Sequence, residues 1–255
     1  MSLSALFKKS LKYFDLDVSF SCPAGKTVVM IGPSGGGKTT VIRMLAGLET
    51  PDEWILRFGN EIWFDSERRV NVKPQKRRLG YVFQDYNLFP HLNLYDNAAF
   101  AAVDKKEVDS LFELFGISHL KKRKPHMVSG GERQRCAICQ ALARHPRVLL
   151  LDEPFSALDA VTRTEMQDLL RTLISRHNAS AVMVTHDIDE ALILADRAIL
   201  IGNKPGRRIG EWRLGLPYPR HDALLEMNSE RVEILQALRD AHGHKRQVET
   251  VEFVI

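Results

Sequence analysis

Eight residues near the start of the chain, Gly32–Thr39, have the types and the spacing that bind phosphate. They match the pattern G-x-x-x-x-G-K-[ST] in full. Glycines let successive backbone N–H groups turn inward, so that these groups form a concave nest for phosphate oxygens. In such a loop Lys38 reaches the β- and γ-phosphates and the Thr39 hydroxyl holds Mg²⁺. The segment therefore predicts a site for a nucleoside triphosphate.

The residues on either side of this loop fit that prediction. Val28–Ile31 is a short, continuous apolar run, which is typical of a buried parallel strand. Thr40–Ala46 reads as a helix that Gly47 closes, and its N-terminus adds a partial positive charge. A glycine-rich turn that matches by chance is the alternative, and it does not explain the flanking strand and helix. The residues expected to bind the triphosphate are Gly32, Pro33, Ser34, Gly35, Gly36, Gly37, Lys38, Thr39 and Thr40.

Two adjacent carboxylates follow a second buried run, Val148–Leu151. Carboxylates at such a place are costly unless they meet a cation or accept hydrogen bonds. Asp152 suits a Mg²⁺ ligand, directly or through water. Glu153 points elsewhere and can polarise the attacking water. The alternative is that Asp-Glu-Pro only caps the next turn.

A second possible anion site begins at Ser129. Ser129 is a good N-cap, and Gly130 and Gly131 after it leave N–H groups free at a helix start. One triphosphate needs only one phosphate nest in a chain. The second nest therefore suggests that it serves a nucleotide bound by another copy of the chain.

The rest of the pattern must position these residues. Further buried strands are expected at Ala181–Val184 and Ala198–Ile201, and amphipathic helices at Arg133–Arg144 and over 166–174. Strands that alternate with helices predict a mostly parallel sheet covered on both faces. Trp54–Phe58 and Glu61–Phe64 flank Gly59-Asn60, which predicts a hairpin.

Other segments give weaker signals. We expect a loop from Asp65 to Arg78, a helical pattern from about Phe83 to Lys122, and a Pro- and Arg-rich tail from about Lys204. The tail is expected to end in one polar helix around Arg231–Ala241. Met1–Leu3 is set aside as not belonging to the fold.

Composition limits the function classes. The chain has 255 residues, 44% hydrophobic and 27% charged, and a net charge of +4. These values are typical of a globular domain, no apolar run is long enough to cross a bilayer, and no signal peptide is expected. The charge is too small to argue for nucleic acid. Cys136 and Cys139 fall on an apolar helix face, so we expect them to be buried thiols in a reducing compartment.

Several motifs together resemble a known family. Ser129–Glu132 resembles the signature motif of ATP-binding cassette (ABC) ATPases. Gln84 resembles the family's Q-loop glutamine, Ser156–Asp159 its D-loop, and Thr185–Asp187 its switch-histidine segment. With the phosphate loop these make five ordered motifs over residues 10–205.

The resemblance implies an α/β fold. A P-loop NTPase (RecA-like) core with an antiparallel β layer carries an inserted α-helical lobe. The RecA-like and β lobe would cover about 1–85 and 131–205, the helical lobe about 86–130, and a short C-terminal tail about 206–255. No separate regulatory domain is expected.

The resemblance also implies roles. Two copies would close head to tail, with ATP between the phosphate loop of one and Ser129, Gly130, Gly131 and Glu132 of the other. Glu153 would be the catalytic base, His186 would hold the γ-phosphate, and Gln84 would contact Mg²⁺ and face the membrane partner. The Mg²⁺ ligands would be Thr39, Gln84 and Asp152, and Asp159 would belong to the D-loop.

Within the family, ATPases of importers fit best. Segment Lys76–Asp85 looks like the ATPases of molybdate and related oxyanion importers, while Pro205–Arg220 is more similar to those of nitrate, sulfonate and taurine importers. Both resemblances imply the uptake of a small anion. The expected partners are permease subunits and, indirectly, a substrate-binding protein, and no nucleic acid is expected. The chain would lie peripherally on the cytoplasmic face of the membrane. The alternative is a soluble ABC-type ATPase of repair or translation.

The sequence departs from the family pattern at two positions. Leu11 stands where an aromatic residue that stacks on adenine is common, so Tyr13 or Phe14 is expected to replace it. Trp54 stands where the family usually has a glycine. The loop from Gln84 to Pro90 is unusually apolar, with Tyr86, Leu88, Phe89 and Pro90. Either these residues pack inside the helical lobe, or part of the set lines a groove for a short helix of the permease.

Overall fold

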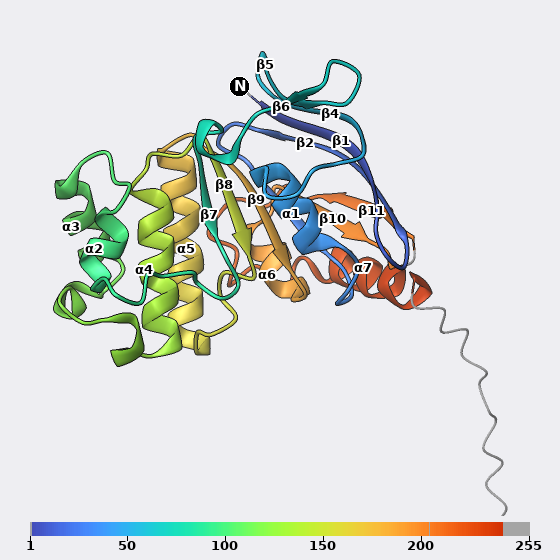
Figure 1. Cartoon of the computed structure of the whole chain (residues 1–255). Helices are drawn as coiled ribbons and strands as arrows, with labels where there is room; N and C mark the ends of the chain where they lie inside the picture. Colours follow the sequence, from blue (N-terminus) through green and yellow to red (C-terminus); the bar gives the residue numbers. More distant parts are fainter. Residues whose placement is uncertain (1, 204, 242–255) are drawn as a thin grey trace, which may run out of the picture.

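The computed structural model describes residues 2–203 and 205–241 (Figure 1). These residues contain one 11-stranded sheet of order β6-β5-β4-β1-β2-β11-β10-β3-β9-β8-β7. Its strands are β1 (Ser2–Ser10), β2 (Asp15–Pro23), β3 (Thr27–Ile31), β4 (Glu53–Phe58), β5 (Glu61–Asp65), β6 (Val70–Asn71), β7 (Leu79–Val82), β8 (Val148–Asp152), β9 (Ser180–Thr185), β10 (Arg197–Ile201) and β11 (Gly206–Arg213). The α-helices are α1 (Lys38–Ala46), α2 (Leu94–Ala99), α3 (Lys105–Leu114), α4 (Gly130–Leu142), α5 (Ala160–Arg176), α6 (Ile188–Leu194) and α7 (Asn228–Ala241).

The sheet has a parallel half and an antiparallel half. Strands β10, β3, β9, β8 and β7 run parallel to one another. Strands β2, β1, β4, β5 and β6 pair antiparallel. This confirms the predicted α/β fold with an antiparallel β layer, and it confirms the hairpin around Gly59-Asn60.

Alternating side chains of the parallel strands enter two separate cores. Val29 and Leu149 belong to one hydrophobic cluster, which includes residues of α4, α5 and α6. Their neighbours Met30 and Leu150 belong to the other, which includes α1 and the antiparallel strands. Because successive side chains of a strand point to opposite faces, continuous apolar runs are what a sheet covered on both sides requires.

Helices α2 and α3 lie beside α4, at the end of the molecule away from the antiparallel strands (Figure 1). Leu94 and Phe112 are fully buried against this side of the core. The expected continuous helical pattern from Phe83 to Lys122 was wrong in detail. Residues 84–93 form no α-helix, and α2 begins only after Asn93, whose side chain accepts the Asp96 N–H.

The stretch Asp65–Arg78 holds more structure than the predicted loop. It contains β6 and a 3-10 turn at Pro74–Lys76. Arg77 is 1% exposed, and its guanidinium donates to the carbonyls of Met44 and Leu45 at the end of α1. Burial lowers the pKa of Arg77 to about 10. The sequence does not predict this, because nothing in the charged segment Asp65–Arg78 distinguishes Arg77, which is buried and caps α1, from its exposed neighbours.

Both ends of the described chain join the sheet. Leu3, which the sequence analysis had set aside, is fully buried in β1. The tail forms β11, antiparallel to β10, before α7. The sequence pattern hides β11, because Arg207, Arg208 and Arg213 are exposed and only Gly206 of the strand is fully buried, although β11 lies between β2 and β10.

Trp54 has φ of 87°, in the left-handed region that favours glycine. Its N–H donates to Ser66 Oγ over 2.9 Å, and Ser66 N–H donates to its carbonyl. The ring lies beside Lys8 Nζ, 5.6 Å from the ring centroid. The backbone therefore keeps the turn expected of glycine, although a tryptophan occupies the position.

Two further expectations concern composition. Cys136 and Cys139 are buried, as predicted, and so is Cys22. Within the described residues, no helix has both the length and the apolar character needed to span a bilayer.

Candidate nucleotide site

The phosphate loop lies between β3 and α1, and its shape is fixed by the backbone. Gly35 and Gly37 have φ of 79° and 86°, which side-chain-bearing residues rarely adopt. A Cβ on Gly32 would lie 2.3 Å from the carbonyl oxygen of Ile201 in β10. Glycine is therefore required at position 32 by close packing against the neighbouring strand.

Lys38 begins α1 and turns back over this loop. Its Nζ donates to the carbonyl oxygens of Gly32, at 2.8 Å, and Pro33, at 2.9 Å. Burial lowers the pKa of Lys38, while nearby Glu153 and Asp152 act in the opposite direction. A buried ammonium at the mouth of a phosphate nest is a strong anion partner, because little water screens it.

Asp152 at the end of β8 is bonded to the loop. The Thr39 hydroxyl donates to Asp152 Oδ1 over 3.2 Å. Burial raises the pKa of Asp152, and the adjacent Glu153 adds to this, whereas the Thr39 hydrogen bond opposes it. The sequence analysis did not identify Tyr81, whose hydroxyl also bonds Asp152. No pattern in the sequence pointed to Tyr81, because β7 and β8 become neighbours only in the folded sheet.

These residues fit Mg²⁺. A buried carboxylate whose pKa is raised gains from a cation, and carboxylate, hydroxyl and amide oxygens are the ligands that Mg²⁺ prefers. Thr39 and Gln84 line the cavity and supply such oxygens, and Asp152 supplies another beside them, where it is hydrogen-bonded to Thr39.

Glu153 occupies the centre of the predicted catalytic group. Its Oε1 lies 3.2 Å from Nδ1 of His186, and its Oε2 accepts from Nε2 of Gln84 at 3.4 Å. Glu153 has φ of 48°, which turns the chain sharply after β8. The turn does include a cap-like bond, since Ser156 Oγ donates to the Glu153 carbonyl. That bond uses the backbone and leaves the carboxylate free to face Gln84 and His186.

The strand order explains how distant residues meet. The loop follows β3, His186 follows β9, Glu153 follows β8, and Gln84 comes shortly after β7. These four strands are consecutive neighbours in the sheet and parallel. Their carboxyl ends therefore meet at one edge, where ligands bind in open α/β sheets.

Thr185 belongs to the predicted switch-histidine segment, but the sequence alone assigns it no role of its own. Its buried hydroxyl donates to Glu190 Oε2 over 2.7 Å and accepts the Asp187 N–H at 3.0 Å. Asp187 in turn caps α6 by accepting the N–H groups of Asp189 and Glu190. This network fixes the backbone on both sides of His186. The sequence hints at this network only through the position of Thr185, between the apolar run of β9 and His186.

The Ser129 segment forms the predicted helix start but lies outside this cavity. Ser129 and Glu132 form a reciprocal capping box at the N-terminus of α4. A Cβ on Gly131 would lie 3.0 Å from Leu158 Cδ2, so this helix start packs against the segment that contains Asp159. Asp159 caps α5 by accepting the Thr162 N–H. The described residues that line the phosphate cavity are Leu11, Lys12, Tyr13, Phe14, Ser34, Gly35, Gly37, Lys38, Thr39, Thr40, Gln84 and Glu153.

Two aromatic residues reach this cavity, and they differ in exposure. Tyr13 is 74% exposed. Phe14 is packed below the loop, where its ring would contact a Cβ added at Gly37 or Gly206. Tyr13 is therefore the more exposed of the two aromatic side chains, and Lys12 Nζ lies over its ring at 5.2 Å from the centroid.

Comparisons with known proteins agree with this arrangement. The sequence profile of the family described as ABC transporter matches residues 16–156. The chain is 41% identical over 239 residues to the aliphatic sulfonates import ATP-binding protein SsuB 1 of Xanthomonas axonopodis pv. citri, covering 89% of this chain and 90% of that protein. It is 42% identical over 207 residues to the sulfate/thiosulfate import ATP-binding protein CysA 2 of Rhizobium meliloti, covering 76% of this chain and 54% of that protein.

The chain thus spans nearly all of SsuB 1 but only about half the length of CysA 2. Among solved structures, the dimeric ATP-binding cassette MJ0796 bound to ADP and Pi superposes with a TM-score of 0.71 at 28% identity, covering 85% of this chain and 100% of that one. The motifs, the sheet edge that gathers them and these matches agree, and the chain belongs to the ABC transporter family as one of its ATP-hydrolysing subunits.

Proposed function

We propose that this ATPase drives the import of a small anion by closing as a head-to-tail pair on ATP beneath permease subunits. The observation that carries the proposal is a groove beside the nucleotide cavity. We call it the Phe89 groove. Its lining includes Leu48, Tyr81, Phe83, Phe89, Phe100 and Arg144.

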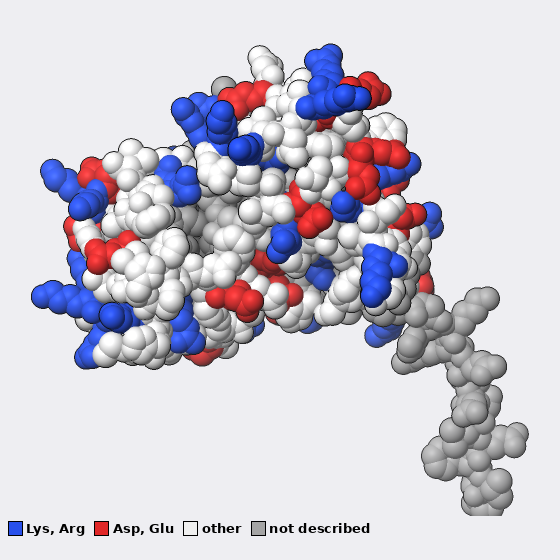
Figure 2. All heavy atoms as spheres, viewed as in Figure 1, with Lys and Arg blue, Asp and Glu red and all other residues white. Residues whose placement is uncertain are grey.

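The Phe89 groove is apolar and accessible. The rings of Phe89 and Phe100 pack in a tilted arrangement, with 4.7 Å between centroids and 50° between planes, and Phe100 is 65% exposed. On the face drawn in Figure 2, charged residues of both signs lie mainly around the outside, and uncharged surface lies between the helical side and the sheet side. An exposed apolar groove of this kind suits an amphipathic helix from a partner.

The apolar loop from Gln84 to Pro90 supports both interpretations of the sequence: some of its apolar residues pack against the core, and another lines the groove. Tyr86 and Leu88 pack against the core that includes α4. Phe89 lines the groove. The interpretation that this region forms a docking groove therefore depends on Phe83, Phe89 and Phe100.

The groove and the nucleotide cavity meet at adjacent residues. Phe83 lines the Phe89 groove, whereas Gln84 lines the cavity and donates to Glu153. A shift of a helix seated on Phe83 would move Gln84, and ATP-dependent movement of Gln84 would move the helix. This two-residue connection supports coupling between hydrolysis and transport.

At the nucleotide, the proposed roles follow the geometry. Lys38 and the loop N–H groups bind the β- and γ-phosphates, and Thr39, Asp152 and Gln84 would hold Mg²⁺, which would neutralise charge on the phosphates. Glu153 accepts a proton from the attacking water, and His186 orients the γ-phosphate while Glu153 holds its Nδ1. Tyr13 stacks on adenine.

The second phosphate nest supports the pairing of two copies. Ser129, Gly130 and Gly131 are not among the described residues that line the cavity of their own chain, which supports a role for this helix start at a partner's ATP. The proposed division into a RecA-like and β lobe (about 1–85 and 131–205), a helical lobe (about 86–130) and a tail (about 206–255) fits this pairing. Light scattering of Glu153→Gln should detect a dimer with ATP and a monomer with ADP.

The solute class rests on the relatives. Proteins named for the import of aliphatic sulfonates and of sulfate/thiosulfate are over 40% identical to the chain. A small sulfonate or oxyanion is therefore the proposed cargo, held by the permease and a substrate-binding protein, with this chain peripheral on the cytoplasmic face. A soluble role in repair or translation is the competing function, and it predicts no membrane partner.

The test reconstitutes the chain with its permease subunits in liposomes. Phe100→Asp and Phe89→Asp should leave the ATPase activity of the isolated chain nearly unchanged and abolish anion uptake. Leu225→Asp, at an exposed leucine that does not line the groove, is the matched control and should leave both unchanged. Failure of the wild-type chain to co-purify with any permease would overturn the proposal in favour of a soluble ATPase.

A further inference from the structure

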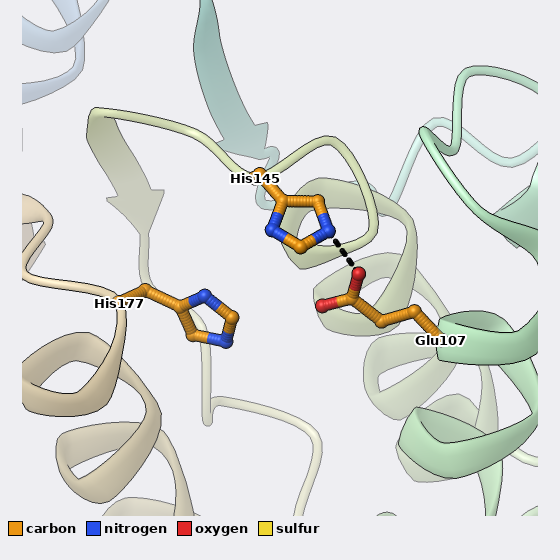
Figure 3. A group of neighbouring side chains, drawn as sticks. All are labelled: Glu107, His145 and His177. Carbon is orange, nitrogen blue, oxygen red and sulfur yellow. Dashed lines mark ion pairs between the residues drawn. The ribbon is translucent and has the colours of Figure 1, made fainter.

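Three side chains with metal-binding atoms converge just beyond the C-terminal end of α4, in the part of the chain that leads to the start of β8. Glu107 lies in the first turn of α3, His145 in the loop after α4, and His177 directly after α5. Figure 3 shows the three side chains directed toward one another from these three segments. We propose that Glu107, His145 and His177 form a site for a divalent transition metal such as Zn²⁺.

The distances suit an ion. The ligand atoms of the three side chains all lie within 4.8 Å of one another. A tetrahedral Zn²⁺ with bonds of about 2.1 Å holds its ligand atoms roughly 3.4 Å apart. His145 Nε2 and Glu107 already form an ion pair, and the imidazoles of His145 and His177 lie 5.6 Å apart between centroids. Small rotations of side chains that are not fully buried close the remaining gap.

The chemistry of the ligand set selects the class of metal. Two imidazoles and one carboxylate favour Zn²⁺, Ni²⁺, Co²⁺ or Cu²⁺ over Mg²⁺ and Ca²⁺, which prefer oxygen alone. Three protein ligands leave a fourth position for water. The His145 side chain is 46% exposed, so an ion can reach the site from solvent. The neighbouring Arg144 side chain lines the Phe89 groove.

The backbone supports the convergence. His145 has φ of 49°, an uncommon conformation for a residue other than glycine, and its N–H donates to the Leu142 carbonyl. Val103 N–H donates to the Ala143 carbonyl, which brings the start of α3 to the end of α4. These bonds hold two of the three segments together before any ion binds.

An ion here would join α3 to the end of α5. Among the described residues, Glu107 and His177 are linked through His145, which pairs with Glu107 and lies edge-on to the His177 ring. Because a ligand of the native state alone stabilises that state, Zn²⁺ should raise the melting temperature. An ion pair without metal affinity would give no such rise, which separates the two interpretations.

The experiment uses the full chain without an affinity tag. The sequence has two further histidines, His242 and His244, outside the described residues, so both are replaced by alanine in every sample. Zn²⁺ affinity is measured by competition with a chromophoric chelator, and the ligand field by the visible spectrum of bound Co²⁺.

One ion per chain is expected. His145→Ala, His177→Ala and Glu107→Gln should each weaken binding by about tenfold or more, since even outer partners of a metal site contribute that much. His119→Ala, at an exposed histidine elsewhere, should have no effect. Absence of binding, or Zn²⁺ affinity that the three substitutions leave unchanged, as binding at the nucleotide site would give, would overturn the proposal. A Zn²⁺-dependent rise in melting temperature that His177→Ala retains would do the same.

Discussion

Glu153 and His186 face each other across the ends of two adjacent strands, with 3.2 Å between Oε1 and Nδ1. The same carboxylate accepts from Gln84 with its other oxygen. One side chain thus contacts two of the residues implicated by the family resemblance. This makes Glu153 the point at which substitution tests the arrangement most directly.

Glu153→Gln should keep ATP binding and lower hydrolysis by roughly 10² or more, the scale of a lost general base. Glutamine retains the size and the contacts of glutamate but cannot accept the proton of water. Nucleotide affinity by calorimetry and phosphate release under saturating ATP are the two measurements. Unchanged turnover would show that Glu153 only caps the turn after β8 and is not the catalytic base.

Tyr13→Ala should weaken ATP binding by about 1–3 kcal/mol, the range for a base stacked on an aromatic ring. Tyr13→Phe keeps the ring and should bind as the wild type does. Phosphate contacts remain in both variants, so calorimetry with ATP and with inorganic triphosphate separates base from phosphate binding. Equal loss in the two variants would assign Tyr13 a role through its hydroxyl instead.

Asp52 makes stability depend on pH at the acid end. The hydrogen bond from Lys9, and that from the Ser10 N–H, hold the pKa of Asp52 below its ordinary value of 3.8. A carboxyl with a depressed folded-state pKa stabilises the protein above the unfolded-state pKa, and this contribution disappears as pH falls through the folded-state pKa. Asp52→Asn should therefore be less stable than the wild type at pH ~7, and the difference should shrink below pH ~4.

Urea titrations at several pH values measure this difference, and Glu226→Gln at an exposed carboxyl is the control. A deficit of Asp52→Asn that is the same at pH ~3 and pH ~7 would mean that packing, and not charge, is responsible.

The three thiols should resist modification while the chain is folded. Burial raises the pKa of Cys22 and of Cys136 to about 12, and raises that of Cys139 as well. Because the thiolate is the reactive form, Ellman's reagent at pH ~8 should label the native protein very slowly and all three thiols in denaturant. Rapid labelling of all three thiols in the native chain would show that both β2, which carries Cys22, and α4, which carries Cys136 and Cys139, open readily.

The prediction from sequence succeeded where a residue's neighbours in the chain decide its environment. The phosphate loop lies between a buried strand and a helix, and Asp152 and Glu153 follow a buried run, so their place at a sheet edge could be inferred. The family resemblance added Gln84 and His186, which the structure brings to Glu153.

It failed where a contact distant in sequence decides the structure. Arg77 is buried because it caps α1, more than thirty residues earlier. Strand β11 forms because β10 and β2 offer open edges. Tyr81 meets Asp152 only because β7 and β8 are neighbours. None of these partners leaves a pattern within the segment itself.

The strand that carries the phosphate loop depends on parts of the chain that are made much later. In the sheet β3 lies between β9 and β10, which begin at Ser180 and Arg197. During synthesis, residues 27–31 have no sheet neighbour until these strands have left the ribosome. Contacts so distant in sequence also form slowly, because loop closure must come first. A growing or truncated chain that lacks β9 and β10 should therefore be unable to hold ATP, and nucleotide binding indicates that the parallel half of the sheet has been completed.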